Sequence, residues 1–312
     1  MSRGREIRNI ACLVSITISR IMAEQKVTQR GTPVARVIEL VKSLTQGHAP
    51  ESSWINLPLS PHDFKQLAMH DFWSYVEDNI RFDYDPVAEV LTFRMPSPIH
   101  EQLTALVVGE ILQQLGCLRE DTSTSPTAEI ARSIRWSAST SIRFDDLGLS
   151  TRSPDASFYF GDGKYPTVII ETSFSQKRHD LENLAREYIT RSQMNVQLVV
   201  GLDIGYPKPT KATVSVWTPE YVETNGKPYF YAKKIIDNDP FRDIYSPSTI
   251  FNGMLKLPLS AFKPQPQPHL TLETKPAITI PYRVLSSFLE MAEKHNRNTL
   301  RGSVKRLPPG IR

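Results

Sequence analysis

Two acidic residues stand at the ends of neighbouring apolar runs in the stretch SPDASFYFGDGKYPTVIIETSFSQ, residues 153–176. Asp155 precedes the run ASFYF, and Glu171 follows the run VII. The segment between them is long enough for two short strands joined by the turn GDGKYP. Carboxylate oxygens are the ligands that Mg²⁺ and Mn²⁺ prefer, and an ion-bound water of lowered pKa can attack a phosphodiester. The spacing therefore predicts a divalent-metal site for hydrolysis where two neighbouring strands of a sheet end.

The elements that would position these carboxylates follow from the spacing of apolar residues. Thr32 and Pro33 favour a helix start, as cap and first helical residue. We expect helices over residues 33–44, from Ser60 onward, and over 98–115, 177–191 and 282–294. We expect strands in a hairpin within 80–95 and over 130–136, 141–144, 156–160, 167–170, 196–204, 212–218 and 229–237. This order predicts an α/β fold, a mixed β-sheet flanked by helices, with helical N-terminal and C-terminal extensions.

Four stretches in this order resemble a known superfamily. They are FDYDPVAEVLTFRMPSPIHEQLTALVVGEIL, SPDASFYF, VIIETSFSQKRHDLENLAREYI and LKLPLSAF. Together they resemble the PD-(D/E)XK nuclease superfamily, and most closely the Uma-type restriction endonuclease family and its fungal relatives. The resemblance covers roughly residues 57–262. It implies a restriction-endonuclease-like sheet and a metal-dependent nuclease.

The resemblance also implies roles by position. Asp155 and Glu171 would bind Mg²⁺ or Mn²⁺, and the carbonyl of Thr172 would be a third ligand. Glu89, in the hairpin, matches an acidic position of the family, and His100 matches the histidine that opens the following helix.

Glu110 is a further candidate that the residues themselves suggest. It falls on the apolar face of the helix over 98–115, where an unpaired carboxylate is costly, so a metal or a basic partner would explain it. Simpler interpretations stay open. In these, Glu110 is solvated at the edge of the stripe, and His100 is a helix-start residue or a core hydrogen-bonding group. In the simpler interpretation of the two motif carboxylates, Asp155 is a turn residue and Glu171 is an ion-pair partner at the end of a strand.

The chain departs from the superfamily pattern at one position. That pattern has a lysine two residues after the glutamate, and this chain has Ser173. A lysine from the next helix can substitute, but the corresponding position lies near Leu184. Lys177 and Arg186 are therefore the cations that we expect to offset charge on a phosphate.

Composition sets few limits on function. The formal net charge of +4 is compatible with a nucleic-acid partner but does not require one. Two cysteines, Cys12 and Cys117, cannot form a metal-ligand motif or a disulfide framework, which favours a reducing compartment. No apolar run reaches the roughly 18 residues of a membrane span. We therefore expect no membrane association and an intracellular location, in the cytoplasm or nucleus.

The two ends of the chain differ from its middle. The arginine-rich start leaves three alternatives open: a mitochondrial transit segment, a secretory signal, or a leader without a targeting role. The end carries lysines and arginines without acidic residues after position 294 and is either a solvated tail or a phosphate-contacting arm. We expect a leader and helix over 1–56, a nuclease-like domain over 57–262, and a proline-rich linker, helix and basic tail over 263–312.

The sequence is compatible with three functions. The first is an Mg²⁺-dependent endonuclease acting on DNA, with a homodimer as one possible assembly. The second is a nuclease fold that has lost catalysis and serves as a binding or interaction module, which Ser173 favours. A small-molecule hydrolase is the weakest, because the chain has no Gly-x-Ser-x-Gly motif.

Overall fold

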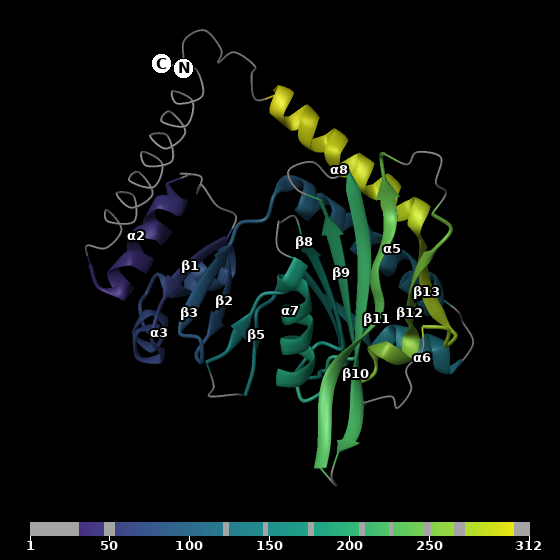
Figure 1. Cartoon of the computed structure of the whole chain (residues 1–312), viewed down its shortest axis with the longest axis horizontal. Coiled ribbons are helices and arrows are strands. Elements are labelled where there is room, and N and C mark those ends of the chain that lie inside the picture. The colour runs from purple at the N-terminus through teal and green to yellow at the C-terminus, as the bar shows by residue number, and fades with distance from the viewer. Residues whose placement is uncertain are drawn as a thin grey trace, which may run out of the picture. The chain divides into compact units, whose positions relative to one another are not determined.

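The computed structural model is a mixed α/β protein with several β-sheets flanked by helices (Figure 1). It describes residues 31–46, 54–120, 125–145, 149–173, 178–205, 210–224, 227–245, 251–264 and 272–302. The expected leader before residue 31, Lys177 and the tail after residue 302 lie outside these ranges. Contacts divide the chain into two compact units. The first is Met1–Ile80 with Tyr84–Phe93, and the second is Arg81–Asp83 with Arg94–Arg312.

In the part that the structure describes, the first unit combines helices with a short stretch of sheet. Its elements are α2 (Pro33–Thr45), β1 (Trp54–Pro58), α3 (Pro61–Ala68), α4 (Trp73–Asn79), the end of β2 (Arg81–Asp85) and β3 (Val90–Arg94). The strand order is β1-β3-β2. Phe64 stacks on Tyr84 with ring centroids 3.9 Å apart and meets Trp73 edge-on. Aromatic packing of this kind accounts for much of the unit's buried apolar surface.

The second unit is built on a six-stranded sheet with the order β11-β10-β9-β8-β7-β4. These strands are β4 (Ile134–Ser137), β7 (Ala156–Phe160), β8 (Val168–Ser173), β9 (Leu198–Ile204), β10 (Lys211–Thr224) and β11 (Lys227–Asp243). β8 and β9 are parallel, and the other neighbours pair antiparallel. The parallel pair is connected through α7 (Arg178–Arg191). In the other sheet, β2 neighbours β6 (Thr151–Arg152), which in turn pairs with β5 (Ile142–Arg143).

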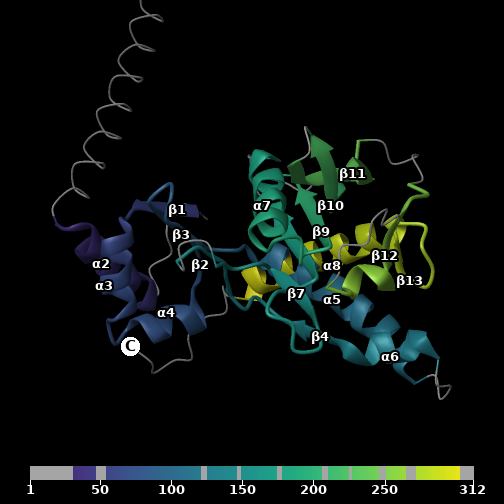
Figure 2. The ribbon, with the colours of Figure 1, turned by 90° about the horizontal axis from the view of Figure 1, so that it is seen from below.

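Helices cover both faces of this sheet, as Figure 2 shows with α7 on one side and α5 and α8 on the other. These two are α5 (Pro98–Arg119) and α8 (Tyr282–Gly302). Side chains alternate between the faces of a strand. Ile170 therefore joins the core under α5, whereas Glu171 faces α7, where Tyr188 contacts it. The face to which each residue of β8 points is thus fixed by its register.

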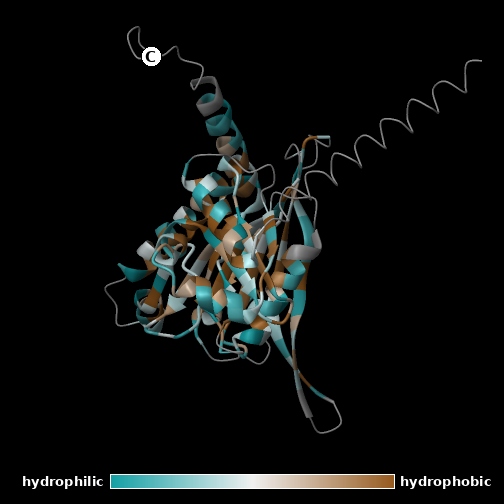
Figure 3. Cartoon of the chain, turned by 90° about the vertical axis from the view of Figure 1, so that its left-hand side faces the viewer, coloured by the Kyte–Doolittle hydropathy of each residue, from teal (hydrophilic) through white to brown (hydrophobic). Residues whose placement is uncertain are grey.

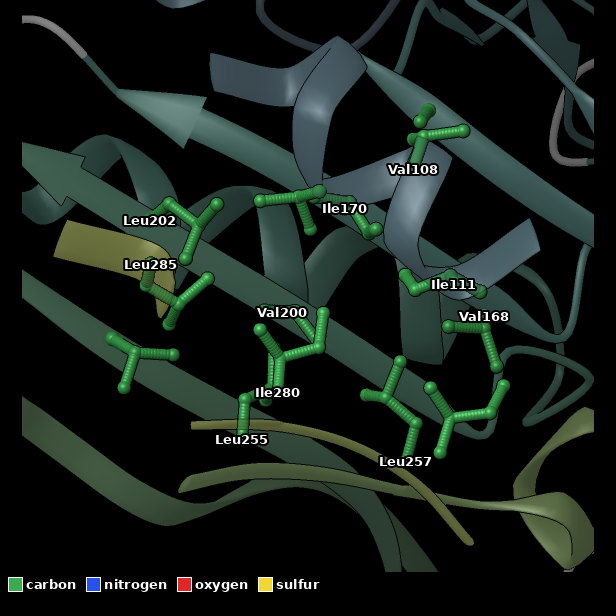
Figure 4. Close-up of a cluster of buried hydrophobic side chains, with 14 of the residues drawn as sticks. Val108, Ile111, Val168, Ile170, Val200, Leu202, Leu255, Leu257, Ile280 and Leu285 are labelled. Carbon is green, nitrogen blue, oxygen red and sulfur yellow. The ribbon is translucent and has the colours of Figure 1, made fainter. Parts of the chain in front are cut away.

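The main core lies between the sheet and α5, α8 and the hairpin of β12 (Met254–Pro258) and β13 (Ala277–Pro281). Figure 4 shows Val168, Ile170, Val200 and Leu202 of the sheet meeting side chains of the hairpin and the two helices. Colouring by hydropathy places the apolar residues in this interior (Figure 3). Burial of such side chains is the main term that stabilises the unit.

The elements after residue 262 belong to this core. β13 pairs with β12, and Leu285 and Leu289 of α8 are fully buried. The second unit therefore continues past the boundary expected at 262/263, because the proline-rich stretch connects two elements that pack together. The expected helix over 282–294 is present and extends to Gly302.

Two local expectations were wrong. The single helix expected from Ser60 is two helices, α3 and α4, separated by a turn. Residues 126–133 form α6 (Pro126–Ser133) before β4, where a strand was expected from 130. Ser125 caps α6 and Pro126 is its first residue, a helix-start signal that outweighs the apolar spacing. A 3₁₀ turn, η1 (Leu259–Phe262), follows β12.

The hairpin of β10 and β11 extends past the rest of the sheet (Figures 1 and 3). Its base is buried, whereas the outer part exposes aromatic side chains. Tyr221 and Phe230 face each other across the strands with centroids 5.4 Å apart, and Tyr229 is 67% exposed. The outer part is thus held by cross-strand pairs rather than by a helix.

Candidate functional site: a buried carboxylate–arginine cluster

Asp155 and Glu171 lie next to each other in the second unit, where Asp155 immediately precedes β7 and Glu171 belongs to β8 of the six-stranded sheet. Ala156 pairs with Ile170, so the next residue on each strand, Asp155 and Glu171, lies at adjacent positions. Both side chains are almost completely buried, with exposures of 0% and 1%. The expectation that the two carboxylates lie close together is therefore met by the register of β7 and β8.

Arg94 lies between these two carboxylates. Its Nη2 atom donates to Glu171 Oε2 at 2.7 Å and to Asp155 Oδ1 at 3.3 Å. Its Nη1 atom donates to the carbonyl of Ser153 at 2.8 Å and lies 3.8 Å from Asp83 Oδ2. A single guanidinium at the end of β3 thus bridges both residues, which a planar group with five donors can do.

Asp155 has two further hydrogen-bond donors and a histidine neighbour. Arg81 Nη1 donates to Asp155 Oδ1 at 2.7 Å, and the backbone N–H of Thr172 donates to Oδ2, also at 2.7 Å. His100 Nε2 lies 3.0 Å from the same Oδ2 atom. Ser97 caps α5 by accepting a hydrogen bond from the His100 N–H, which fixes this histidine at the helix start.

Glu171 is bound from α7. The hydroxyl of Tyr188 donates to Glu171 Oε1 at 2.6 Å and is buried with it. Asp83 completes the cluster by accepting from the backbone N–H of Ser153 at 2.9 Å. Three carboxylates and two guanidinium groups are therefore gathered in one buried place.

The cluster shifts the acidity of its members in opposite directions. Burial raises the pKa of Glu171 to about 8, which the nearby charge of Asp155 favours and the Arg94 guanidinium opposes. Burial would also raise the pKa of Asp155, but His100, Arg94 and Arg81 outweigh it and hold that pKa far below its ordinary value. Burial likewise raises the pKa of Tyr188, as does Glu171.

Three other sequence candidates can be placed. The hydroxyl of Thr172 shares a 2.8 Å hydrogen bond with Thr104, and its carbonyl remains a predicted ligand. Glu110 accepts from Gln114, which also bonds β13, about 15 Å along α5 from His100 at 1.5 Å per residue. The hydrogen-bond partner of the Glu110 carboxylate is thus the Gln114 amide, and this contact does not support the expected role of Glu110 as a metal ligand.

Glu89 belongs to the first unit, at the turn between β2 and β3, with a φ of 54°. Its carbonyl accepts from the N–H of Leu59 at 2.8 Å, a turn contact within that unit.

The cation expected from α7 is not Arg186. Its side chain is exposed and donates to Asn183 at 3.2 Å, one helical turn away. Residues two apart on a helix point in widely different directions, so Tyr188 faces Glu171 and Arg186 does not. Lys177 lies outside the described residues.

Sequence reasoning missed Arg81, Asp83, Arg94 and Tyr188. A usable signal was present in the hairpin, where Arg81 and Asp83 alternate with the apolar residues of β2. Such alternation places both charges on one face of the strand. Tyr188 falls at the helical spacing of the apolar residues Leu181, Leu184 and Ala185, and the partner of its hydroxyl cannot be read from spacing.

Asp155 and Glu171 supply carboxylate oxygens, the type of donor that a hard cation prefers. Among the residues that the structure describes, no group of three acidic, histidine or cysteine side chains could hold a metal ion. Mg²⁺ in phosphate chemistry, however, is commonly held by one or two carboxylates together with water and substrate oxygens. Asp155 and Glu171 meet that requirement, and the shared Arg94 nitrogen marks a point between them where positive charge is accommodated.

Comparison with known proteins gives no independent assignment: no model of a protein family matches this chain, and no curated protein does. Within the described part of the chain, no helix has both the length and the apolar character needed to cross a membrane.

Proposed function

We propose that the second unit is a restriction-endonuclease-like domain that acts as an Mg²⁺-dependent endonuclease on DNA. The observation that carries this proposal is the meeting of Asp155 and Glu171 at adjacent positions of β7 and β8. The sheet order around a parallel β8–β9 pair and the motif order along the chain support it as well.

In this proposal Asp155 and Glu171 hold the ion, with the Thr172 carbonyl as a further oxygen ligand. When bound, the ion supplies a water of lowered pKa and offsets charge on the phosphate. His100, 3.0 Å from Asp155, orients that carboxylate, as does the Thr172 N–H. Mn²⁺ would serve as an alternative ion.

The test combines binding and cleavage. Mg²⁺ and Mn²⁺ are titrated calorimetrically into wild type, Asp155→Asn and Asp162→Asn, and cleavage of supercoiled plasmid is assayed in parallel. Asp162 is exposed and pairs only with an exposed arginine in the described contacts, so its variant is the matched control. We expect metal-dependent heat and cleavage in wild type and the control, and loss of both in Asp155→Asn. Cleavage that survives Asp155→Asn would contradict the site assignment.

A second candidate is a nuclease fold that has lost catalysis and binds nucleic acid or another partner. It is favoured by Arg94, which already bonds both carboxylates, and by Ser173 at the motif position of the lysine. Wild type that binds DNA in a gel-shift assay but shows neither metal-dependent heat nor cleavage would favour this candidate over the first.

A further inference from the structure

Arg94 is the guanidinium whose described contacts include both Asp155 and Glu171. Arg81 also reaches Asp155, but it divides its contacts between that residue and Glu101 and is more exposed. Arg152, another buried arginine, pairs with Glu187 instead. One side chain therefore contacts the two residues that a metal would need.

The cluster depends on this side chain for charge balance. A guanidinium remains charged at every physiological pH. Burial lowers the pKa of Arg94, but Glu171, Asp155 and Asp83 outweigh burial and raise it well above its ordinary value. Without the Arg94 guanidinium, Asp155 and Glu171 would be left as buried carboxyl groups with one cationic partner fewer, an arrangement that is strongly destabilising.

A divalent ion would need the oxygens that Arg94 now contacts. Metal–oxygen distances are about 2 Å, so an ion cannot bind Glu171 Oε2 and Asp155 Oδ1 while a guanidinium nitrogen lies 2.7 Å from the first and 3.3 Å from the second. The other oxygen of each carboxylate already accepts a hydrogen bond, from the Tyr188 hydroxyl and from the Thr172 N–H. The two cations are mutually exclusive at this point. Whichever binds more strongly determines whether the carboxylates are available to an ion.

We propose that Arg94 is a tethered competitor of the divalent ion: it holds Asp155 and Glu171 together in the ion-free protein and must leave at least one of them before an ion binds. The inference rests on the proposed function for the identity of the ion. Arg94 is then a positioning residue, and its release from the carboxylates determines the metal affinity of the site. In the ion-free protein, Arg94 is also a cation beside the two carboxylates, although Ser173 stands where the motif has a lysine.

The test is a Mn²⁺ titration, followed by calorimetry and by the electron paramagnetic resonance signal of free Mn²⁺. The proteins are wild type, Arg94→Met, Arg94→Lys and the control Arg152→Met, which removes a buried arginine that pairs outside the site. We expect Arg94→Met to bind Mn²⁺ at least tenfold more tightly than wild type. The control should match wild type, and Arg94→Met combined with Asp155→Asn should lose the gain. Equal Mn²⁺ affinity in wild type and Arg94→Met would overturn the inference.

Arg94→Lys covers the case in which Arg94→Met does not fold. An ammonium is a single point charge that cannot span both carboxylates as a guanidinium does. We therefore expect Arg94→Lys to bind Mn²⁺ severalfold more tightly than wild type and to gain more thermal stability from Mn²⁺. Unchanged affinity in a folded Arg94→Lys protein would also overturn the inference.

Plasmid cleavage measured on the same proteins separates the two proposals. Tighter Mn²⁺ binding in Arg94→Met without cleavage by any protein leaves Arg94 as the competitor and removes the nuclease function. If wild type cleaves plasmid and binds Mn²⁺, but Arg94→Met binds Mn²⁺ no more tightly than wild type, the nuclease function is kept and the competitor role of Arg94 is rejected. Neither Mn²⁺ binding nor cleavage in any protein removes both.

Discussion

Glu171 gives the cluster a pH dependence at the scale of one residue. Its pKa is raised to about 8 in the folded protein, mainly by burial, from an ordinary value of 4.5. Between these values the folded protein holds a proton that the unfolded chain has lost. The free energy of unfolding should therefore fall as pH rises from about 5 to 8.

Glu171→Gln should remove this slope, because the amide stays neutral at every pH. We expect the variant to approach or exceed wild-type stability at pH 8, as measured by urea unfolding at several pH values. Glu187→Gln is the control, since Glu187 lies on the same helix and pairs with Arg152. A Glu171→Gln protein that keeps the wild-type slope would contradict the buried, protonated carboxyl.

Asp155 should behave in the opposite way. Although burial opposes it, the surrounding cations hold its pKa below the ordinary value, so its stabilising contribution is present at neutral pH and is lost in acid. Asp155→Asn removes a charge that Arg81, Arg94 and His100 contact. The loss should be about 3 kcal/mol or more at pH 7. The difference from wild type should narrow at acidic pH, and a loss below 1 kcal/mol would count against the cluster.

At the scale of the element, the position of α8 depends on Gly253 before β12. A Cβ atom at this position would lie 2.2 Å from the ring of Tyr282, the first residue of α8. The two residues are also joined by a backbone hydrogen bond of 2.9 Å. A side chain at position 253 would therefore push the start of α8 away from the hairpin.

Gly253→Ala should destabilise the second unit by about 1–3 kcal/mol, the usual cost of overpacking. Gly109→Ala is the matched control, because a Cβ atom in this part of α5 meets no atom within 4 Å. It should be neutral or stabilise by up to about 1 kcal/mol through helix propensity. Thermal unfolding of both variants checks the pair, and equal effects would refute the close approach.

The expectation for the elements succeeded where the sequence carries local signals. The helices at Pro33 and Pro98 begin with a capping residue and a proline, and β8 is a plain apolar run. The division of the chain into domains was harder to predict from the sequence. β12 and β13 pair across a stretch of prolines that resembles a linker, and only the buried residues of α8 show that it returns to the core.

The same limit applies to the candidate site. Asp155 and Glu171 follow from motif spacing, because strand register brings them together. Arg94 does not, since its contacts join positions 61 and 77 residues apart in the chain. Long-range ion pairs depend on how separate elements pack, which no local pattern encodes.

At the scale of the whole molecule, we expect the C-terminal elements to be required for folding of the second unit, because they contribute to its core. A chain that ends at Phe262 would lack β13 and α8 and would expose the apolar residues that they cover. We expect this truncated chain to be unfolded or aggregated, as checked by circular dichroism and size-exclusion chromatography. A soluble, cooperatively unfolding product would instead favour a domain that ends at residue 262.

The uneven support of the β10–β11 hairpin has a consequence for local opening. Val214 and Val216 at its base are fully buried, whereas Tyr221 and Tyr229 further out are largely exposed. Backbone amides near the outer pairs should exchange with deuterium through local fraying, many-fold faster than amides at the base, which need larger unfolding events. Hydrogen-exchange mass spectrometry would reveal this gradient, and uniform protection along both strands would mean that something else braces the outer hairpin in solution.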